Sequence, residues 1–351
     1  VISGPNETLG VDSRRGIEIV IDDKPEVLGH PVELVGEDAL CSAEGGQTAL
    51  TKLASDPSLI GVIGTNCSSA GEPASKIASD AGMVLISPSN TAPSLTDPEG
   101  TWNPGYLRSC HNDKVQGAAM ADFAYNTLGL RSAAVIHDGD PYTEGLASVF
   151  SDSFQELGGE VIAFEAVSPD ATDVLPVLNT IAAAGPPEMI YYPVFIPLGS
   201  LITKQSQDVA DLAGVVLAGA DGMQSPQFID AAGDNSEDMY LSGPDLGFAN
   251  TLYDDFLAMY KDKYGTDPTA PFHAHAFDAT NMLFDAIEKV AVTDDDGTIH
   301  IGRQALRDAV AATANMNGIT GSLTCDAYGD CANAQISVSQ VQGGEFVPIW
   351  P

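Results

Sequence analysis

The chain has 351 residues, 44% of them hydrophobic, so it is long enough for two globular domains and too apolar to be disordered. Its 49 acidic and 14 basic residues give a net charge of −35, which argues against binding to nucleic acid or to anionic membrane surfaces. No apolar run approaches the roughly 20 residues of a membrane-spanning helix. The acidity indicates solubility or a salty habitat and identifies no ligand.

Short apolar segments alternate with longer helical segments through the first two thirds of the chain. We predict strands at residues 32–35, 59–63, 83–86, 133–137, 161–167, 189–192, 215–218 and 239–242. Helices are predicted at residues 43–55, 72–81, 118–128, 144–157, 174–184 and 198–212. This alternation is typical of parallel sheets with right-handed crossovers, and the number of strands predicts two doubly wound sheets.

The last third has a different pattern. Three helices are predicted at residues 250–264, 274–290 and 302–314, and they are followed by antiparallel strands at 321–324, 334–341 and 346–349. The acidic run at residues 294–297 is predicted to be a solvated loop. No repeat of 20–50 residues occurs, and no long Pro/Ser linker separates two halves.

The five cysteines contain no CxxC pair and no spacing typical of a zinc site. Cys325 and Cys331 flank a Gly-containing turn, which predicts a disulfide and hence an oxidising compartment outside the cytoplasm. Five unrelated buried thiols are the alternative. An odd cysteine must remain, and we expect it to be Cys110. No signal peptide is visible, as in a mature exported chain, although a cytosolic protein would also lack one.

Catalytic motifs are absent: the sequence has no G-x-S-x-G elbow, Walker loop, G-x-G-x-x-G or H-E-x-x-H. His273 and His275 lie two positions apart, so a helix would turn them to different faces, and surface or helix-start histidines are the favoured interpretation over a metal pair. His137 ends a predicted strand, where packing is favoured over a role as general base. We therefore predict no enzyme, cofactor or metal.

Two junctions between a strand and a helix carry hydroxyl groups. Ser68 and Ser69 follow the predicted strand 59–63, at a helix start where free N–H groups and the helix dipole attract an anion. Plain N-capping by Ser69 is the alternative. Residues 87–93 form a polar, proline-stiffened loop after strand 83–86. Ligands of open α/β sheets bind outside such strand ends, so the two loops predict one pocket of the size of a carboxylate.

The chain resembles the extracytoplasmic solute-binding proteins of ABC transporters for Leu/Ile/Val-type amino acids, which have the type I periplasmic-binding fold. The resemblance runs nearly end to end. It lies in Gly4-Pro5, Cys67-Ser68-Ser69 with Pro73-Ala74-Ser75, Ile86-Ser87-Pro88 with Thr91, Arg108-Ser109 with Asp113 and Gln116-Gly117, Ile136-His137-Asp138 with Tyr142 and Glu144-Gly145-Leu146-Ala147, Tyr191-Tyr192, and Gly219-Ala220-Asp221-Gly222.

This resemblance implies two doubly wound α/β lobes that are joined by three crossovers and hold a ligand cleft between them. Lobe 1 would comprise residues 1–113 and 248–323, and lobe 2 residues 114–247 and 324–351. It also implies a disulfide between Cys41 and Cys67, which would anchor the loop that presents Ser68. Cys325 and Cys331 would lie at the third crossover, and Cys110 would stay free near the first.

The resemblance assigns the ligand-binding residues one by one. Ser68 and Thr91, with the backbone of Ser89 or Asn90, would hold the carboxylate and amine of an α-amino acid. Asp221 would bind the ammonium, although a capping carboxylate before Gly222 is the alternative from the residues alone. Aromatic positions of lobe 2 are occupied by Tyr142 and by Phe195, where a tyrosine is usual. Leu9 replaces an aromatic residue that the family often has in its first loop.

The implied function is that of a receptor, expected to be monomeric, which captures an apolar α-amino acid and delivers it to an ABC transporter permease. It would act outside the cytoplasm, either in the periplasm or lipid-anchored at the cell surface, with no nucleic acid as a partner. The alternatives are a sensor ectodomain, or the same fold binding a small amide or an aromatic carboxylate.

Overall fold

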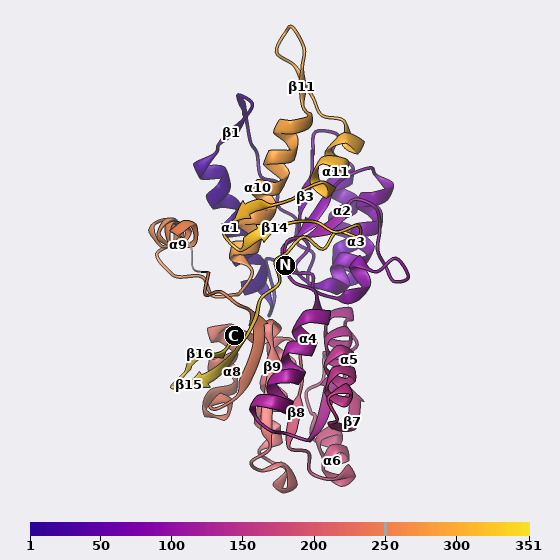
Figure 1. The fold of residues 1–351 in the computed structure, drawn as a ribbon, viewed down its shortest axis with the longest axis vertical. Coiled ribbons are helices and arrows are strands. Elements are labelled where there is room, and N and C mark those ends of the chain that lie inside the picture. Colours follow the sequence, from indigo (N-terminus) through magenta and orange to yellow (C-terminus); the bar gives the residue numbers. More distant parts are fainter. Residues whose placement is uncertain (249–250) are drawn as a thin grey trace. The chain divides into compact units, whose positions relative to one another are not determined.

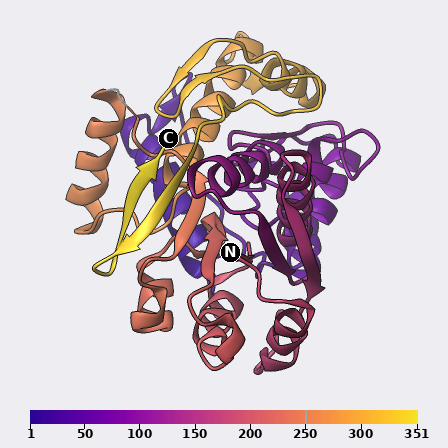
Figure 2. The ribbon, with the colours of Figure 1, turned by 60° about the horizontal axis from the view of Figure 1, so that its bottom comes forward.

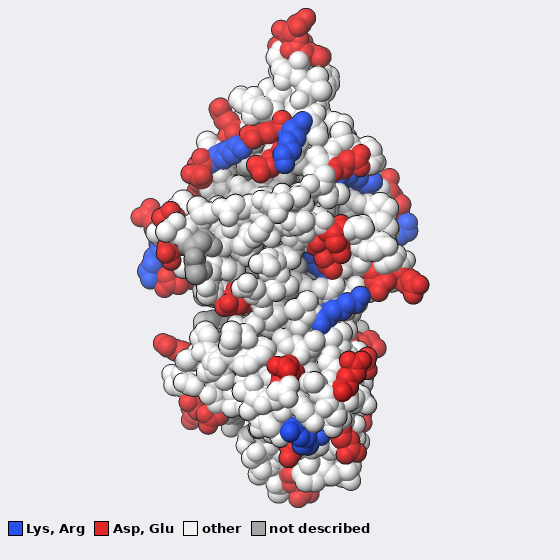
Figure 3. Space-filling model, in the orientation of Figure 1, with Lys and Arg blue, Asp and Glu red and all other residues white. Residues whose placement is uncertain are grey.

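The computed structural model describes residues 1–248 and 251–351. The chain divides into two compact units. Unit 1 comprises Val1–His111 and Leu246–Ala334, and unit 2 comprises Asn112–Asp245 and Gln335–Pro351, so the chain passes between them three times. Figure 3 shows acidic side chains scattered over the visible face, with few basic ones among them.

Unit 1 is built on a small parallel sheet of three strands, in the order β3 (Val62–Ile63), β4 (Leu85–Ser87) and β5 (Tyr106–Arg108). Its helices are α1 (Glu7–Asp23), α2 (Ala43–Ala54), α3 (Ser68–Asp80), η1 (Pro93–Thr96), α9 (Thr251–Tyr264), α10 (His273–Val290) and α11 (Arg303–Ala311). Three small antiparallel pairs complete it: β1 (Glu26–Val27) with β2 (His30–Pro31), β11 (Val292–Thr293) with β12 (Ile299–His300), and β13 (Met316–Gly318) with β14 (Gly321–Leu323).

Helices cover both faces of this sheet because successive side chains of a strand point to opposite sides. Leu85 packs in one apolar cluster with residues of α2 and α3, whereas Ile86 packs in another with residues of α10 and α11. In Figure 1, α1 runs beside α10, and the two helices pack closely. Gly16 makes this approach possible, because a Cβ there would lie 2.3 Å from the carbonyl oxygen of His273.

Unit 2 contains a seven-stranded sheet in the order β16–β15–β10–β9–β8–β6–β7. The strands are β6 (Ser132–His137), β7 (Glu160–Ala166), β8 (Met189–Tyr191), β9 (Val216–Ala220), β10 (Tyr240–Pro244), β15 (Ile336–Gln342) and β16 (Glu345–Trp350). The first five run parallel, and β15 and β16 join the edge as an antiparallel hairpin, drawn in yellow in Figure 2.

Helices lie on both faces of the sheet of unit 2, as in a doubly wound fold. They are α4 (Asp113–Asp122), η2 (Phe123–Thr127), α5 (Pro141–Glu156), α6 (Leu175–Ala184), α7 (Ile196–Ser206), η3 (Ala210–Leu212), η4 (Asp221–Met223), α8 (Pro226–Ala232) and η5 (Gly233–Ser236). Val135 packs with residues of α4 and α5, whereas its neighbour Ile136 packs with residues of α6, α7 and α8. The predicted α/β class with mostly parallel sheets is thus confirmed.

Some local predictions were wrong. Residues 32–35 form no strand; together with β3 they line a largely apolar hollow of about 200 Å³. The helix α1 was not predicted at all. Helix α3 begins at Ser68, four residues earlier than predicted, and continues through Pro73. The first residue of the predicted helix 250–264 lies outside the described residues, and α9 covers the rest. The acidic run at residues 294–297 is exposed, as predicted, and lies at the turn between β11 and β12.

The unit boundaries differ from the predicted lobes by two residues at the first two junctions and by eleven at the third. The reason for the larger difference is that residues 324–334 associate with unit 1. In that segment, the amide of Cys331 donates to the carbonyl oxygen of Arg108 at 3.1 Å, and the amide of Arg108 donates to Gly329 at 2.8 Å. The Cys325–Cys331 disulfide therefore belongs to unit 1 and precedes the third junction.

Candidate functional site

The junction between β3 and α3 places Ser68 at the first residue of the helix. Its hydroxyl is buried and accepts a hydrogen bond from the amide of Ala92 at 3.2 Å, which links this junction to the loop after β4. The predicted alternative, N-capping by Ser69, is wrong: the N-cap position is Cys67, and the Ser69 hydroxyl reaches the Cys41 carbonyl oxygen at 3.5 Å.

Both predicted disulfides are present, and Cys110 is a buried thiol outside them. The Cys41–Cys67 bond joins the starts of two helices, because Cys41 precedes Ser42, the N-cap of α2, and Cys67 is the N-cap of α3. It therefore anchors the chain directly before Ser68.

The loop after β4 is held by the hydroxyl of Ser87. This oxygen accepts hydrogen bonds from the amides of Ser89 at 3.2 Å and Asn90 at 2.9 Å, and it donates to the carbonyl oxygen of Thr65 at 2.7 Å. The Ser89 hydroxyl donates to the backbone of Asn66 at 2.9 Å, and Asn90 Oδ1 accepts from the Thr65 hydroxyl at 3.1 Å. The side chains of the predicted site residues Ser89 and Asn90 therefore hydrogen-bond to Asn66 and Thr65 and stabilise the loop.

Thr91 differs from its neighbours in this loop. Its hydroxyl oxygen is buried and has no hydrogen-bond partner among the described residues; the same is true of Asn90 Nδ2. Buried polar groups are nearly always hydrogen-bonded, and an unpaired one is costly. A ligand bound at the carboxyl end of a parallel strand can supply the hydrogen bond that this hydroxyl lacks.

Leu9 lies on the first turn of α1 and is buried. Its carbonyl oxygen accepts from the side-chain amide of Asn66 at 3.4 Å, and the same nitrogen lies 3.3 Å from the Ser89 hydroxyl. Asn66 thus connects α1 to the loop after β4, and we did not predict this role. Its only sequence signal is its position in the polar run directly before the predicted ligand residue Ser68.

In unit 2, the strand order identifies the place where ligands bind in folds of this kind. Taken as β7–β6–β8–β9–β10, the parallel strands follow the doubly wound order 2-1-3-4-5, in which ligands bind beyond the carboxyl ends of the first and third strands. Tyr142 follows β6, Phe195 follows β8, and Asp221 follows β9 directly. The rings of Tyr142 and Phe195 lie 5.3 Å apart between centroids.

Asp221 is a buried carboxylate with two side-chain donors. Its Oδ1 accepts a hydrogen bond from Gln116 Nε2 at 2.7 Å and another from the Tyr142 hydroxyl at 3.2 Å. Burial raises the pKa of Asp221 to about 6, although both hydrogen bonds act to lower it. No Lys or Arg within residues 1–248 and 251–351 forms an ion pair with it. Such a group is suited to bind a cation, because a buried charge needs a partner of opposite sign.

The contacts of Asp221 do not match the alternative prediction of a simple capping carboxylate, because they come from side chains of α4 and α5. Gln116 was not among the predicted site residues. Its amide nitrogen also donates to the carbonyl oxygen of Ser242 at 3.1 Å, so it fixes Asp221 relative to β10. The signal that could have identified it is its place in the Gln116-Gly117 pair that the resemblance contains.

The histidines have structural surroundings. His137 accepts a hydrogen bond from the amide of Gly139 at 3.2 Å and packs against Phe164, with ring centroids 5.0 Å apart. His273 is the first residue of α10, as the helix-start alternative predicted, but both His273 and His275 are buried rather than on the surface. His273 Nε2 lies 2.8 Å from the Tyr253 hydroxyl. The described part of the chain contains no group of three or more His, Cys, Asp or Glu residues that could hold a metal ion.

Comparison with known proteins assigns the family. A model of the family described as "Periplasmic binding protein" matches residues 1–345. The chain belongs to this family. Among its relatives is the "Leu/Ile/Val-binding protein homolog 3" of Brucella melitensis biotype 1, which is 25% identical over 99% of this chain and 90% of the relative.

Two further proteins support the assignment. The "Leucine-, isoleucine-, valine-, threonine-, and alanine-binding protein" of Pseudomonas aeruginosa is 26% identical over 96% of this chain and 87% of the relative. The solved structure of a leucine binding protein LivK from Thermotoga maritima MSB8 superposes with a TM-score of 0.89 at 28% identity, covering 99% of this chain and 95% of that one. These relatives are named as binding proteins and not as enzymes, and the predicted type I periplasmic-binding fold is confirmed.

Periplasmic binding proteins act outside the cytoplasm, and the two disulfides fit such an oxidising compartment. Among the helices described in the structure, none is both long enough and apolar enough to cross a membrane.

Proposed function

We propose that this periplasmic binding protein captures an aliphatic α-amino acid, of the Leu/Ile/Val type, and delivers it to the permease of an ABC transporter. The observation that carries the proposal is the buried carboxylate of Asp221, which has no cationic partner among the described residues and receives only neutral donors from Gln116 and Tyr142. An α-ammonium group supplies the missing positive charge.

The carboxylate of the same ligand requires neutral or positive donors. Unit 1 supplies the unpaired hydroxyl of Thr91 and the start of α3 at Ser68, where the helix dipole and unpaired N–H groups favour an anion. We infer that Ser68, Thr91 and the loop at Ser89 and Asn90 bind the ligand carboxylate.

The ligand side chain is assigned to apolar surroundings. Leu9 in unit 1, and the ring pair of Tyr142 and Phe195 in unit 2, would contact it. Leu9 offers an aliphatic surface, which favours an aliphatic side chain. The names of the relatives from Brucella and Pseudomonas point to the same ligand class.

The finer parts of the proposal concern what the protein does with the ligand. We propose that it binds the amino acid without converting it, because His137 and His273 are engaged in packing and hydrogen bonding and its relatives are named as binding proteins. It would act as a monomer, either free in the periplasm or lipid-anchored at the outer face of the membrane, with the permease as its membrane partner.

Isothermal titration calorimetry of protein refolded from denaturant, to remove any carried-over ligand, tests this proposal. We expect leucine, isoleucine or valine to bind more tightly than the other amino acids and to be recovered unchanged. A ligand at 100 times its Kd should add about 2.7 kcal/mol to the free energy of unfolding. Binding of benzoate or a small amide, with no heat from any amino acid, would show that the ligand class is wrong.

A further inference from the structure

The backbone on both sides of Thr91 is held by one buried arginine. Arg108 is the last residue of β5 and is fully buried. One of its terminal nitrogens, Nη1, donates to the carbonyl oxygen of Asn90 at 2.9 Å and to that of Ala92 at 2.8 Å. The Asn90 carbonyl belongs to the peptide group directly before Thr91, and the Ala92 carbonyl belongs to the peptide group between Ala92 and Pro93. The guanidinium therefore holds the backbone on both sides of Thr91.

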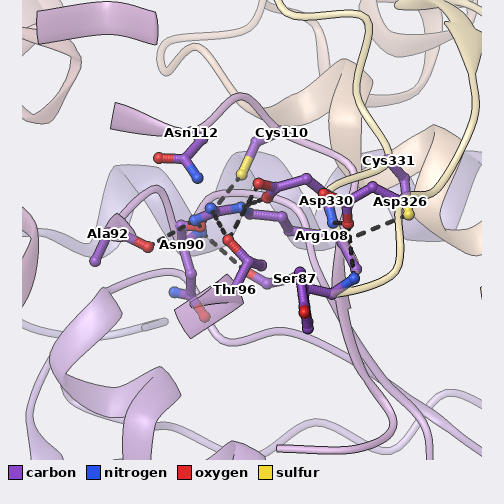
Figure 4. A network of polar contacts seen from close by, with 12 residues as sticks. Ser87, Asn90, Ala92, Thr96, Arg108, Cys110, Asn112, Asp326, Asp330 and Cys331 are labelled. Carbon is purple, nitrogen blue, oxygen red and sulfur yellow. Dashed lines mark hydrogen bonds and ion pairs between the residues drawn. The ribbon is translucent and has the colours of Figure 1, made fainter. Parts of the chain in front are cut away.

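The remaining donors of Arg108 form a closed network with two further side chains (Figure 4). Its Nε makes an ion pair with Asp330 Oδ1, and its Nη2 donates to the Thr96 hydroxyl at 2.5 Å. Thr96 in turn donates to Asp330 Oδ2 at 3.1 Å. The planar, forked guanidinium reaches four acceptors at once, which the single ammonium of a lysine cannot do.

Asp330 lies in the short loop that the Cys325–Cys331 disulfide closes. Within the loop, Asp326 Oδ1 accepts the amides of Tyr328 and Asp330, both at 2.9 Å. Gly329 lets the loop lie directly on β5: its φ is +96°, and a Cβ there would be 2.5 Å from the Tyr106 carbonyl oxygen.

We propose that Arg108 and Asp330 are positioning residues for ligand binding, which hold the 90–92 backbone in the geometry that presents the Thr91 hydroxyl and N–H group. The loop closed by Cys325 and Cys331 supplies the counter-charge, although it is separated from Arg108 by 222 positions in the sequence. The ligand-binding part of this inference rests on the proposed function.

The test uses Arg108→Lys and Asp330→Asn, with Arg307→Lys as a matched control. Arg307 also holds carbonyl oxygens of unit 1, at Met83 (2.8 Å), Ala78 (3.0 Å) and Ser79 (2.8 Å), but these precede β4, whereas the 90–92 loop follows it. Hydrogen exchange of the amides of residues 89–92 is measured in the ligand-free proteins. The Kd for leucine is measured by calorimetry, and the Tm by calorimetric scanning.

We expect Arg108→Lys to speed hydrogen exchange at residues 89–92 and to raise the Kd for leucine roughly tenfold or more. Loss of a residue that orients a metal ligand by a hydrogen bond has an effect of about this size on metal affinity. Asp330→Asn should change both in the same direction by less. Arg307→Lys should lower the Tm and leave both quantities unchanged. If Arg108→Lys does not fold, Asp330→Asn and Thr96→Val carry the same comparison.

The outcomes separate the two proposals. Faster exchange at residues 89–92 in a protein whose wild type binds no amino acid would support the positioning role and contradict the proposed function. Unchanged exchange and unchanged Kd in the Arg108 and Asp330 variants would overturn the positioning role. So would an Arg307→Lys variant that weakens leucine binding as much as Arg108→Lys does.

Discussion

The two units place opposite chemistry at equivalent positions of their sheets. In unit 1, the residues after β3 and β4 are neutral, and they offer hydroxyl groups and a helix start. In unit 2, the residue after β9 is a buried carboxylate flanked by neutral donors and aromatic rings. In both units, the carboxyl ends of parallel strands therefore place the candidate ligand-binding residues. The side chains at those ends determine whether an anionic or a cationic group of the ligand is favoured.

The surroundings of Thr91 in unit 1 and of Asp221 in unit 2 differ as well. The loop that carries Thr91 is braced by the buried side chain of Arg108, which forms an ion pair with Asp330. Asp221 is held by two neutral side chains, Gln116 and Tyr142, without any fixed cation in the described chain. A neutral donor needs accurate orientation, whereas a carboxylate needs a low-dielectric environment in which its charge is not already paired. Variants can test each requirement separately.

The largest effect is expected from Asp221→Asn, which removes the charge and keeps an oxygen that can accept from Gln116 and Tyr142. The ammonium of the ligand would then be buried without a counter-ion, so the binding free energy for leucine should weaken by about 2–5 kcal/mol. Calorimetric titration measures this loss. Asp211→Asn, at an exposed position of the same unit, should bind leucine as wild type does. Equal affinities in both variants would remove Asp221 from the site.

A smaller effect is expected from Thr91→Val, which replaces an unpaired hydroxyl with a methyl group. Leucine binding should weaken by about 1.5–3 kcal/mol, the range for a hydrogen bond to a charged group. The free energy of unfolding of the ligand-free protein should not fall, because no hydrogen bond among the described residues is lost.

Thr280→Val provides the opposite case. The Thr280 hydroxyl is buried and donates to the Ala276 carbonyl oxygen at 2.8 Å. Its loss should lower the free energy of unfolding and leave the Kd for leucine unchanged. Denaturant titration measures the free energy of unfolding of both variants, and calorimetry measures their Kd for leucine. A Thr91→Val variant that is destabilised and binds leucine normally would contradict the ligand-binding role of the Thr91 hydroxyl.

The most gradual effect is that of pH on binding. Because the pKa of Asp221 is raised to about 6, the carboxyl becomes protonated as the pH falls through 6 and no longer pairs with an ammonium. The affinity for leucine should therefore drop by about tenfold per pH unit below 6, and level off above it. Titrations between pH 5 and 8 measure this slope. Asp221→Asn should abolish it, and a slope that persists in the variant would assign it to another group.

The same raised pKa of Asp221 has the opposite effect on the pH dependence of the free energy of unfolding. The native ligand-free state holds the proton of Asp221 more tightly than the unfolded state, whose carboxyl has its ordinary pKa of 3.8. The contribution of Asp221 to the free energy of unfolding therefore decreases as the pH rises from about 4 to 6. Asp278, buried in unit 1 with its pKa also raised to about 6, contributes in the same direction. Ionisation of Asp221 as the pH rises therefore lowers the free energy of unfolding of the ligand-free protein and strengthens leucine binding.

Features that depend on local pattern could be predicted from the sequence. The strands of unit 2 carry continuous apolar runs and end in polar residues, so β6, β8 and β9 were found within a few residues. The hydroxyl groups at Ser68 and in the loop of residues 87–93 predicted a pocket because they lie where a strand ends, whereas the role of Thr91 is what the resemblance implies. The Cys325–Cys331 pair was recognised from its spacing around a turn.

Features that depend on contacts between distant segments could not be predicted. Helix α1 was missed because Gly10 and Gly16 break its apolar pattern, and only packing against α10 explains Gly16. Residues 32–35 have the apolar pattern of a strand, but they line a hollow of unit 1 and pair with no strand of the described chain. The network of Arg108 with Asp330 joins positions that no local pattern relates.

The central claim is that Asp221 recognises the ammonium and that other residues recognise the carboxylate. The most direct measurement is a calorimetric cycle of wild type and Asp221→Asn, each titrated with leucine and with 4-methylpentanoate, which keeps the carboxylate and side chain of leucine but lacks the ammonium. We predict that the substitution weakens leucine binding by about 2–5 kcal/mol and leaves 4-methylpentanoate binding unchanged or stronger. An equal loss for both ligands would contradict the account.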